Sequence, residues 1–185
     1  SLLECPRLSV GGISILMHDW AHVYIVSGVF QIELQFLLVT LRMESRGHID
    51  AMRKFLAGFV WPKHMSDCSS MLDESRIDFT KDHFNSDAHE AIQIYAVVCL
   101  FLVLLPEGSC SLAVQSFLRL GDVLDLLSHI KQGHVSVDTL RSTIIAHLRA
   151  HQDAYGDVGW VPKHHLSFHL ADAYARFGTI YSCLT

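Results

Sequence analysis

The sequence predicts a mainly α-helical protein built as a single domain of about six helices. Apolar residues recur at intervals of three and four along several long runs, which is the spacing of a helix that buries one face. Many of these runs begin after Ser or at Pro and end near Gly or Pro, as helices do. Half of the 185 residues are hydrophobic and only 18% are charged, so the chain can bury a sizeable core.

The N-terminal segment, residues 1–27, has few helical features. Its apolar run at 13–17 predicts at most one short buried strand, which leads into Asp19. Two compatible roles follow for Asp19. A carboxylate at the end of a strand is held rigidly, as a catalytic group must be. Asp is also a preferred N-cap residue, so Asp19 can begin a helix.

Five helices are expected between residues 28 and 160, at 29–43, 49–59, 86–105, 112–131 and 137–155. The expected N-caps of the last three are Ser86, Ser111 and Ser136. The polar stretch 62–83 is expected to form a surface loop. Residues 96–105 are apolar on every side, so we expect 92–105 to be the most buried element of the fold. The run is too short for a membrane span, which needs about 20 apolar residues, so no membrane partner is expected.

Two polar features in these helices raise the question of partners. Glu33 lies among apolar residues and therefore needs a hydrogen-bonding partner if it is buried. His147 and His151 are four residues apart on one flank of their helix. They lack the Glu and the spacing of the His-Glu-x-x-His zinc arrangement, so they are not a metalloprotease motif.

A second stripe of acidic residues lies in the helix at 112–131. Asp122, Asp125 and His129 share one face and have the ligand types of a divalent-metal site. The alternative is a solvated face on which Arg119 pairs with Asp122, and this interpretation is favoured.

The final helix, 162–178, begins at Pro162 and ends at Gly178. One polar stripe runs along it at steps of four, three and four, formed by His165, His169, Asp172 and Arg176. Apolar residues flank the stripe on both sides, which favours a cleft or a buried polar network over open solvent. Such a network is either structural or a working site.

Charge and cysteine usage limit the classes of function. The net charge of −5 argues against a stand-alone nucleic-acid-binding protein, which usually carries a basic face. The five cysteines are odd in number and dispersed, which favours a reducing, intracellular compartment over a disulfide framework. The chain starts at Ser1 and ends within an apolar run, so we expect a segment of a longer protein or a gene remnant.

Two motifs resemble parts of a known family. Pro-Lys-His-His at 162–165, with His169 and Arg-Phe-Gly at 176–178, resembles a segment near the C-terminal end of CACTA-type cut-and-paste DNA transposases and their domesticated relatives. His18-Asp19-Trp20-Ala21-His22 resembles the Asp-x-x-His element of the same families. With the region 120–127, the likeness touches most of the chain.

The resemblance implies an RNase-H-like fold in which three carboxylates bind two Mg²⁺ or Mn²⁺ ions and act on a DNA phosphodiester. In several of these families a helical insertion interrupts the core. The chain would then comprise a core-like segment at 1–27, a helical insertion at 28–160 and a return segment at 161–185. DNA as a partner and a nuclear location are implied in the same way.

The resemblance also implies site residues. Asp19 and His22 are the catalytic candidates, and Asp19 is the single candidate metal ligand. Asp19 corresponds either to the second catalytic Asp or to the first residue of a separate Asp-x-x-His element. The polar stripe on the final helix would lie beside the same centre. The other carboxylates of the triad are not found in this chain, so we expect weak binding of Mg²⁺ and DNA and no activity of the chain alone.

Two other functions are compatible with the sequence. The main alternative is a helical protein-interaction or scaffold module whose histidines are structural. A small metal-dependent hydrolase using His165, His169 and Asp172 is less favoured, because no nucleophile or third carboxylate accompanies these residues.

Overall fold

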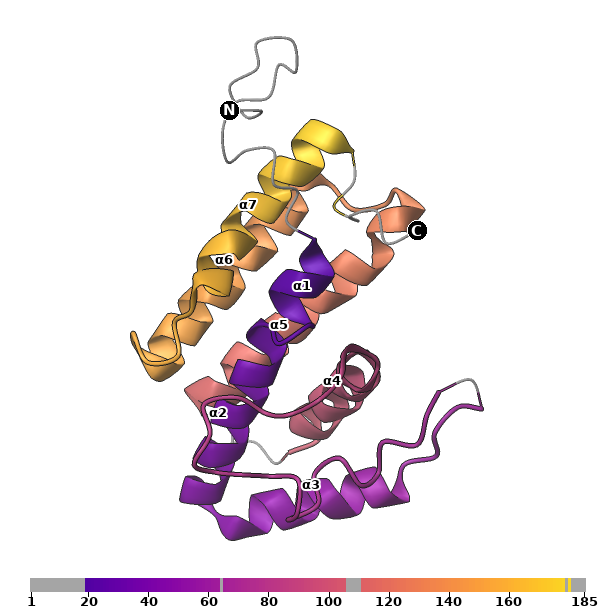
Figure 1. Ribbon diagram of the computed structural model, residues 1–185, viewed down its shortest axis with the longest axis vertical. Coiled ribbons are helices and arrows are strands. Elements are labelled where there is room, and N and C mark those ends of the chain that lie inside the picture. Colours follow the sequence, from indigo (N-terminus) through magenta and orange to yellow (C-terminus); the bar gives the residue numbers. More distant parts are fainter. Residues whose placement is uncertain (1–18, 64, 106–110, 179, 181–185) are drawn as a thin grey trace, which may run out of the picture.

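The computed structural model describes residues 19–63, 65–105, 111–178 and 180 (Figure 1). In these ranges the protein is mainly α-helical and no strand is present, which confirms the predicted class. The strand predicted at 13–17 lies outside the described residues, as does most of the segment 1–27.

Six helices of 13 residues or more make up the described fold, namely α2 (Val29–Glu44), α3 (Arg46–Gly58), α4 (Ala88–Val103), α5 (Leu112–His129), α6 (Val137–Tyr155) and α7 (Pro162–Phe177). A short helix, α1 (Trp20–Tyr24), precedes them, and a 3₁₀ turn, η4 (Ile130–Gln132), extends α5. Ser111 and Ser136 are N-caps as predicted. Asp87 rather than Ser86 begins α4, because its carboxylate forms a capping box with Glu90.

A sharp break separates α1 from α2 at Gly28. A Cβ atom at this position would lie 2.4 Å from the carbonyl carbon of Tyr24, so only glycine allows the two helices to approach each other this closely. The side chain of Gln31 forms hydrogen bonds with backbone groups of the segment between the two helices. Its Oε1 accepts a hydrogen bond from Gly28 N–H at 2.8 Å, and its amide donates to the carbonyl of Ile25.

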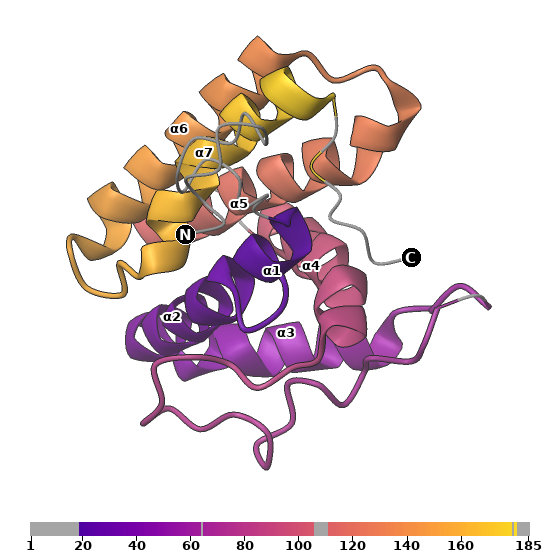
Figure 2. The same ribbon diagram turned by 45° about the horizontal axis from the view of Figure 1, so that its top comes forward.

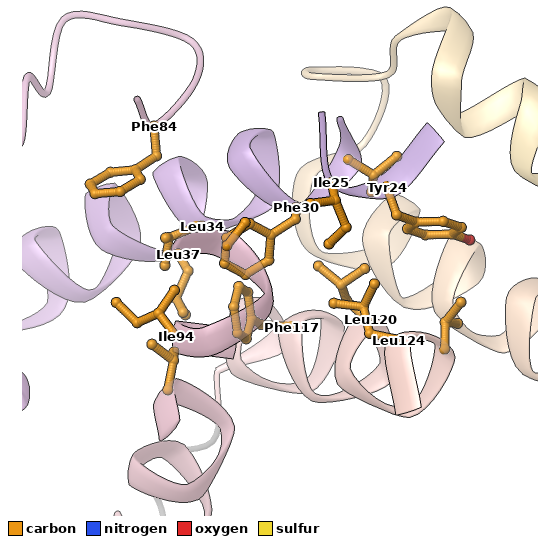
Figure 3. Close-up of a cluster of buried hydrophobic side chains, with 14 of the residues drawn as sticks. Tyr24, Ile25, Phe30, Leu34, Leu37, Phe84, Ile94, Phe117, Leu120 and Leu124 are labelled. Atoms are coloured by element: carbon orange, nitrogen blue, oxygen red, sulfur yellow. The ribbon is translucent and has the colours of Figure 1, made fainter. Parts of the chain in front are cut away.

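The helices form two groups with α1 and α2 between them. Helices α6 and α7 lie side by side, and α5 packs against α6, while α3 and α4 lie at the other end of the molecule (Figures 1 and 2). Aromatic and aliphatic side chains from α1, α2, α4 and α5 meet in the core (Figure 3). At its centre, the ring centroids of Phe30 and Phe117 are 5.9 Å apart.

The connection between α3 and α4 contributes to this core. It has no long helix, as predicted, but it is more than a surface loop, because Met71, Leu72 and Phe84 are fully or almost fully buried. Figure 3 shows Phe84 reaching toward α2 from this connection, and its N–H donates to the carbonyl of Gln31 at 2.9 Å. Buried apolar residues among polar ones have no regular period in a loop, which is why the sequence pattern missed them.

The prediction that 92–105 is the most buried element is wrong. Helix α4 buries seven of its 16 residues, whereas α2 buries nine of 16. The side chain of Leu100 is 44% exposed and that of Val103 is 66% exposed. Helix α4 packs against α3 and α5, and its remaining face points to solvent.

Among the described residues, the segment Trp20–Glu44, which contains α1, the break at Gly28 and α2, is long and apolar enough by length and composition to cross a membrane. Its most apolar window is 67% buried inside the protein, as expected for the core helix of a folded domain.

Candidate functional site

The predicted catalytic pair lies at the start of α1. Asp19 is the N-cap of this helix, which confirms one of its two predicted roles, and its Oδ1 accepts a hydrogen bond from Ala21 N–H at 2.9 Å. Its Oδ2 lies 2.8 Å from Nδ1 of His22, whose side chain is largely exposed. Both carboxylate oxygens of Asp19 therefore have partners within one helical turn.

The polar stripe on α7 faces solvent, so the prediction that it lines a cleft or a buried network is wrong. All four of its residues are exposed, namely His165, His169, Asp172 and Arg176. Asp172 forms an ion pair with Arg141 of α6 at 2.9 Å. Nε2 of His165 and Nε2 of His169 are 3.4 Å apart on the surface.

The face of α7 that is buried is not the one that carries the predicted stripe. It contains two polar residues, His164 and Ser167, beside Leu170 and Ala171. Phe168 and Phe177, which were expected to flank a buried stripe, are each 41% exposed. Apolar spacing alone could not identify a helix face that is built partly from buried polar groups.

The acidic stripe on α5 forms a solvated face, as favoured from the sequence. Arg119 Nη1 lies 3.1 Å from Asp122 Oδ2, and both side chains are more than half exposed. Asp125 accepts a hydrogen bond from the hydroxyl of Tyr95 at 2.9 Å.

A cluster of buried polar side chains that the sequence did not predict as a group lies in the interior, between α2, α6 and α7. Its centre is the carboxylate of Glu33, which is completely buried. Oε1 of Glu33 lies 2.6 Å from Nε2 of His147 and 2.7 Å from Nδ1 of His151, two buried residues of α6. The hydroxyl of Ser116 on α5 lies 3.4 Å from each carboxylate oxygen. We call Glu33, His147, His151 and His164 the buried cluster.

The electrostatics of the buried cluster keep Glu33 ionised. Burial raises the pKa of the Glu33 carboxyl, but the attraction and hydrogen bonds of His147 and His151 outweigh burial and hold this pKa at about 2. An ionised carboxylate only accepts hydrogen bonds. The nitrogen of each imidazole that faces Glu33 therefore carries the proton, which leaves Nδ1 of His147 and Nε2 of His151 as the remaining ring nitrogens.

His164 completes the buried cluster from the first turn of α7. Its ring centroid lies 4.4 Å from that of His151, and the indole of Trp160 stacks on it at 5.1 Å and also lies 5.9 Å from the His151 ring. Nδ1 of His164 accepts a hydrogen bond from Val161 N–H at 3.1 Å. Burial, with a smaller contribution from His151, lowers the pKa of His164 to about 3, so its ring is neutral and carries its proton on Nε2.

Three buried ring nitrogens of the cluster have no hydrogen-bonding partner among the described residues: Nδ1 of His147, Nε2 of His151 and Nε2 of His164. Buried polar atoms normally have partners, and three of these atoms belong to one cluster. Glu33, His151 and His164 each offer a possible metal-ligand atom, and these three atoms lie within 4.8 Å of one another.

The sequence contained part of this site. Glu33 was recognised as a residue in need of a partner, and His147 and His151 were recognised as a pair on one helix flank. Their meeting depends on how α2 packs against α6, across 114 and 118 residues. His164 belongs to the Pro-Lys-His-His motif, but the spacing of polar residues placed only its neighbour His165 in the predicted stripe.

No protein-family model matches this chain, and searches of curated proteins and of solved structures found no significant match. The fold and the site define a mainly helical protein with a buried glutamate–histidine cluster.

Proposed function

We propose that this chain is a helical scaffold module in which buried histidines hold the helices in place. The observation that carries this proposal is the Glu33 carboxylate, which is fully buried and accepts hydrogen bonds from two histidines of another helix. A buried carboxylate that accepts hydrogen bonds from another helix fixes the relative position of the two helices. The positions of the α7 stripe and Asp19 support the proposal, because these residues face solvent or cap a helix.

The test compares buried with exposed histidines. His147→Ala should lower the free energy of unfolding in urea by more than about 2 kcal/mol, because it removes the imidazole and its hydrogen bond to a buried charge. The double variant His165→Ala/His169→Ala is the matched control and should stay within about 0.5 kcal/mol of the parent chain, since both side chains are exposed. Equal stabilities of the two variants would contradict a structural role for the buried histidines.

A segment of a transposase-like protein that does not act on DNA by itself is the second candidate. It rests on the family resemblance of the two motifs, and the contact between Asp19 and His22 at 2.8 Å is compatible with it. Two-metal chemistry needs carboxylates around two ions about 4 Å apart. Over the described ranges, the group of three or more possible metal ligands is Glu33, His151 and His164, which has a single carboxylate.

This second candidate has a direct test. The purified chain should neither nick supercoiled plasmid nor join DNA strands with Mg²⁺ or Mn²⁺, and its net charge of −5 should make DNA binding weak. Robust cleavage that disappears in Asp19→Asn would overturn this expectation and identify the chain as a complete enzyme.

A further inference from the structure

We propose that the buried cluster binds one transition-metal ion, Zn²⁺ in preference to Mg²⁺, between His151 and His164, with Glu33 as the carboxylate that supports His151. The proposal goes beyond a scaffold role, because it assigns a ligand to the interior of the fold. It concerns residues distinct from Asp19 and from the exposed stripe on α7.

The hydrogen bonding of His151 is the first argument. Its Nδ1 lies 2.7 Å from Oε1 of Glu33 and donates to it, while its Nε2 is buried without a partner. Metal-binding histidines usually donate their second ring N–H to a carboxylate or carbonyl, which fixes the tautomer and makes the free nitrogen more basic. Glu33 thus prepares Nε2 of His151 as a ligand.

The neighbouring ring supplies the second argument. Nε2 of His164 is also buried without a partner, and the two ring centroids are 4.4 Å apart. Nδ1 of His164 accepts the Val161 N–H, so the neutral ring carries its proton on Nε2. A metal at Nε2 requires this proton to move to Nδ1, where it would face the Val161 N–H, a second donor. The ring therefore has to turn away from Val161 when the ion binds, and no proton is released.

The donor set decides which ion fits. Imidazole nitrogens and one carboxylate suit Zn²⁺, Co²⁺ or Ni²⁺, whereas Mg²⁺ prefers oxygen ligands and keeps several waters. One possible ligand atom each from His151, His164 and Glu33 lies within 4.8 Å of the other two, so the two imidazoles can reach one ion while Glu33 stays beside His151.

The indole of Trp160 reports on this site. It precedes α7, stacks on His164 with ring centroids 5.1 Å apart, and is 39% exposed. Binding should therefore change the tryptophan fluorescence of the protein.

The experiment titrates the purified, EDTA-treated and dialysed chain with ZnCl₂ by calorimetry, and with CoCl₂ by visible absorption. We expect one ion per chain, a raised melting temperature with Zn²⁺, and no change with Mg²⁺ at millimolar concentration. Glu33→Gln should weaken Zn²⁺ binding by about 10- to 100-fold. His164→Gln should weaken it by at least that factor.

The exposed pair His165 and His169 is the competing explanation, since its Nε2 atoms are 3.4 Å apart. The double variant His165→Ala/His169→Ala should keep the affinity and stoichiometry of the parent chain. Loss of binding in this variant, or the absence of Zn²⁺ binding by the parent chain, would overturn the proposal. If His164→Gln does not fold, NMR of the imidazole nitrogens of the parent chain shows which histidines bind the ion. Zn²⁺ must shift the resonances of His151 and His164, and shifts confined to His165 and His169 would refute the site.

Discussion

Glu33 and His147 are 114 residues apart in the sequence, and their side-chain atoms Oε1 and Nε2 are 2.6 Å apart in a completely buried place. The contact joins α2 to α6. Taking a carboxylate out of water costs several kcal/mol, so the contact is stable only while its partners compensate that cost. The packing of these two helices therefore depends on a small number of polar atoms.

The first prediction concerns the charge at the centre of this contact. Glu33→Gln keeps the shape of the side chain but removes the anion that two imidazoles share. It should lower the free energy of unfolding by about 3 kcal/mol, as expected when one partner of a buried ionic contact is lost. The measurement is urea denaturation followed by circular dichroism.

Glu44→Gln is the matched control, because Glu44 ends the same helix and is exposed. It should change the free energy of unfolding by no more than about 0.5 kcal/mol. A Glu33→Gln variant as stable as Glu44→Gln would show that the buried charge does not hold α2 and α6 together.

The class of the fold could be predicted from the sequence because helix limits are encoded locally. Ser111 and Ser136 cap the helices that they were expected to cap, and Gly178 follows α7 in the left-handed conformation at φ 67°. Each of these features depends on a few neighbouring residues, so a single sequence is enough to read them.

The site could be predicted only in part, because it depends on packing between distant helices. The polar residues of α7 include the predicted stripe through His165 and a separate pair, His164 and Ser167, and both have apolar neighbours. Only contact with His151 of α6 decides that the pair is buried. Similarly, the second half of α4 is apolar all round, but the sequence does not reveal how many helices will cover it.

The second prediction tests the break between α1 and α2. Gly28→Ala would place a Cβ 2.4 Å from the Tyr24 carbonyl carbon, and backbone atoms cannot move aside cheaply. The variant should lose about 3 kcal/mol or more of unfolding free energy, or fail to fold.

Gly58→Ala is the control. Its Cβ would meet nothing within 4 Å, so it should be neutral or stabilise α3 by up to about 1 kcal/mol. Similar melting temperatures for both variants would argue against a tight break at Gly28.

The third prediction concerns the thiol of Cys99. Burial, together with the negative charges of Asp125 and Asp122, raises the pKa of this thiol to about 12. The thiolate is the nucleophile, so iodoacetamide should alkylate Cys99 in the folded chain at pH 8 about 100-fold more slowly, or slower still, than in guanidinium. Timed alkylation followed by peptide mass spectrometry measures both rates, and equal rates would show that Cys99 is open to solvent.

The same thiol affects stability at high pH. Its pKa in the folded chain, about 12, lies above the ordinary value of 9.0, so between these values the folded state keeps a proton that the unfolded state loses. This contribution to stability is complete below pH 9 and is lost as the pH rises toward 12. Cys99→Ser should make the decline in melting temperature over this range less steep.

The fourth prediction tests the orientation of α4. Val98 is completely buried, whereas Leu100, two residues later, is 44% exposed on the outer face. Val98→Asp would place an unpaired carboxylate in the core and should cost several kcal/mol or prevent folding. Leu100→Asp places the same carboxylate at a position that water reaches, so its cost should stay near or below about 1 kcal/mol. Melting temperatures of the two soluble variants, or the loss of helical circular dichroism in Val98→Asp alone, provide the measurement. A larger loss of stability for Leu100→Asp than for Val98→Asp would mean that α4 is buried through its other face.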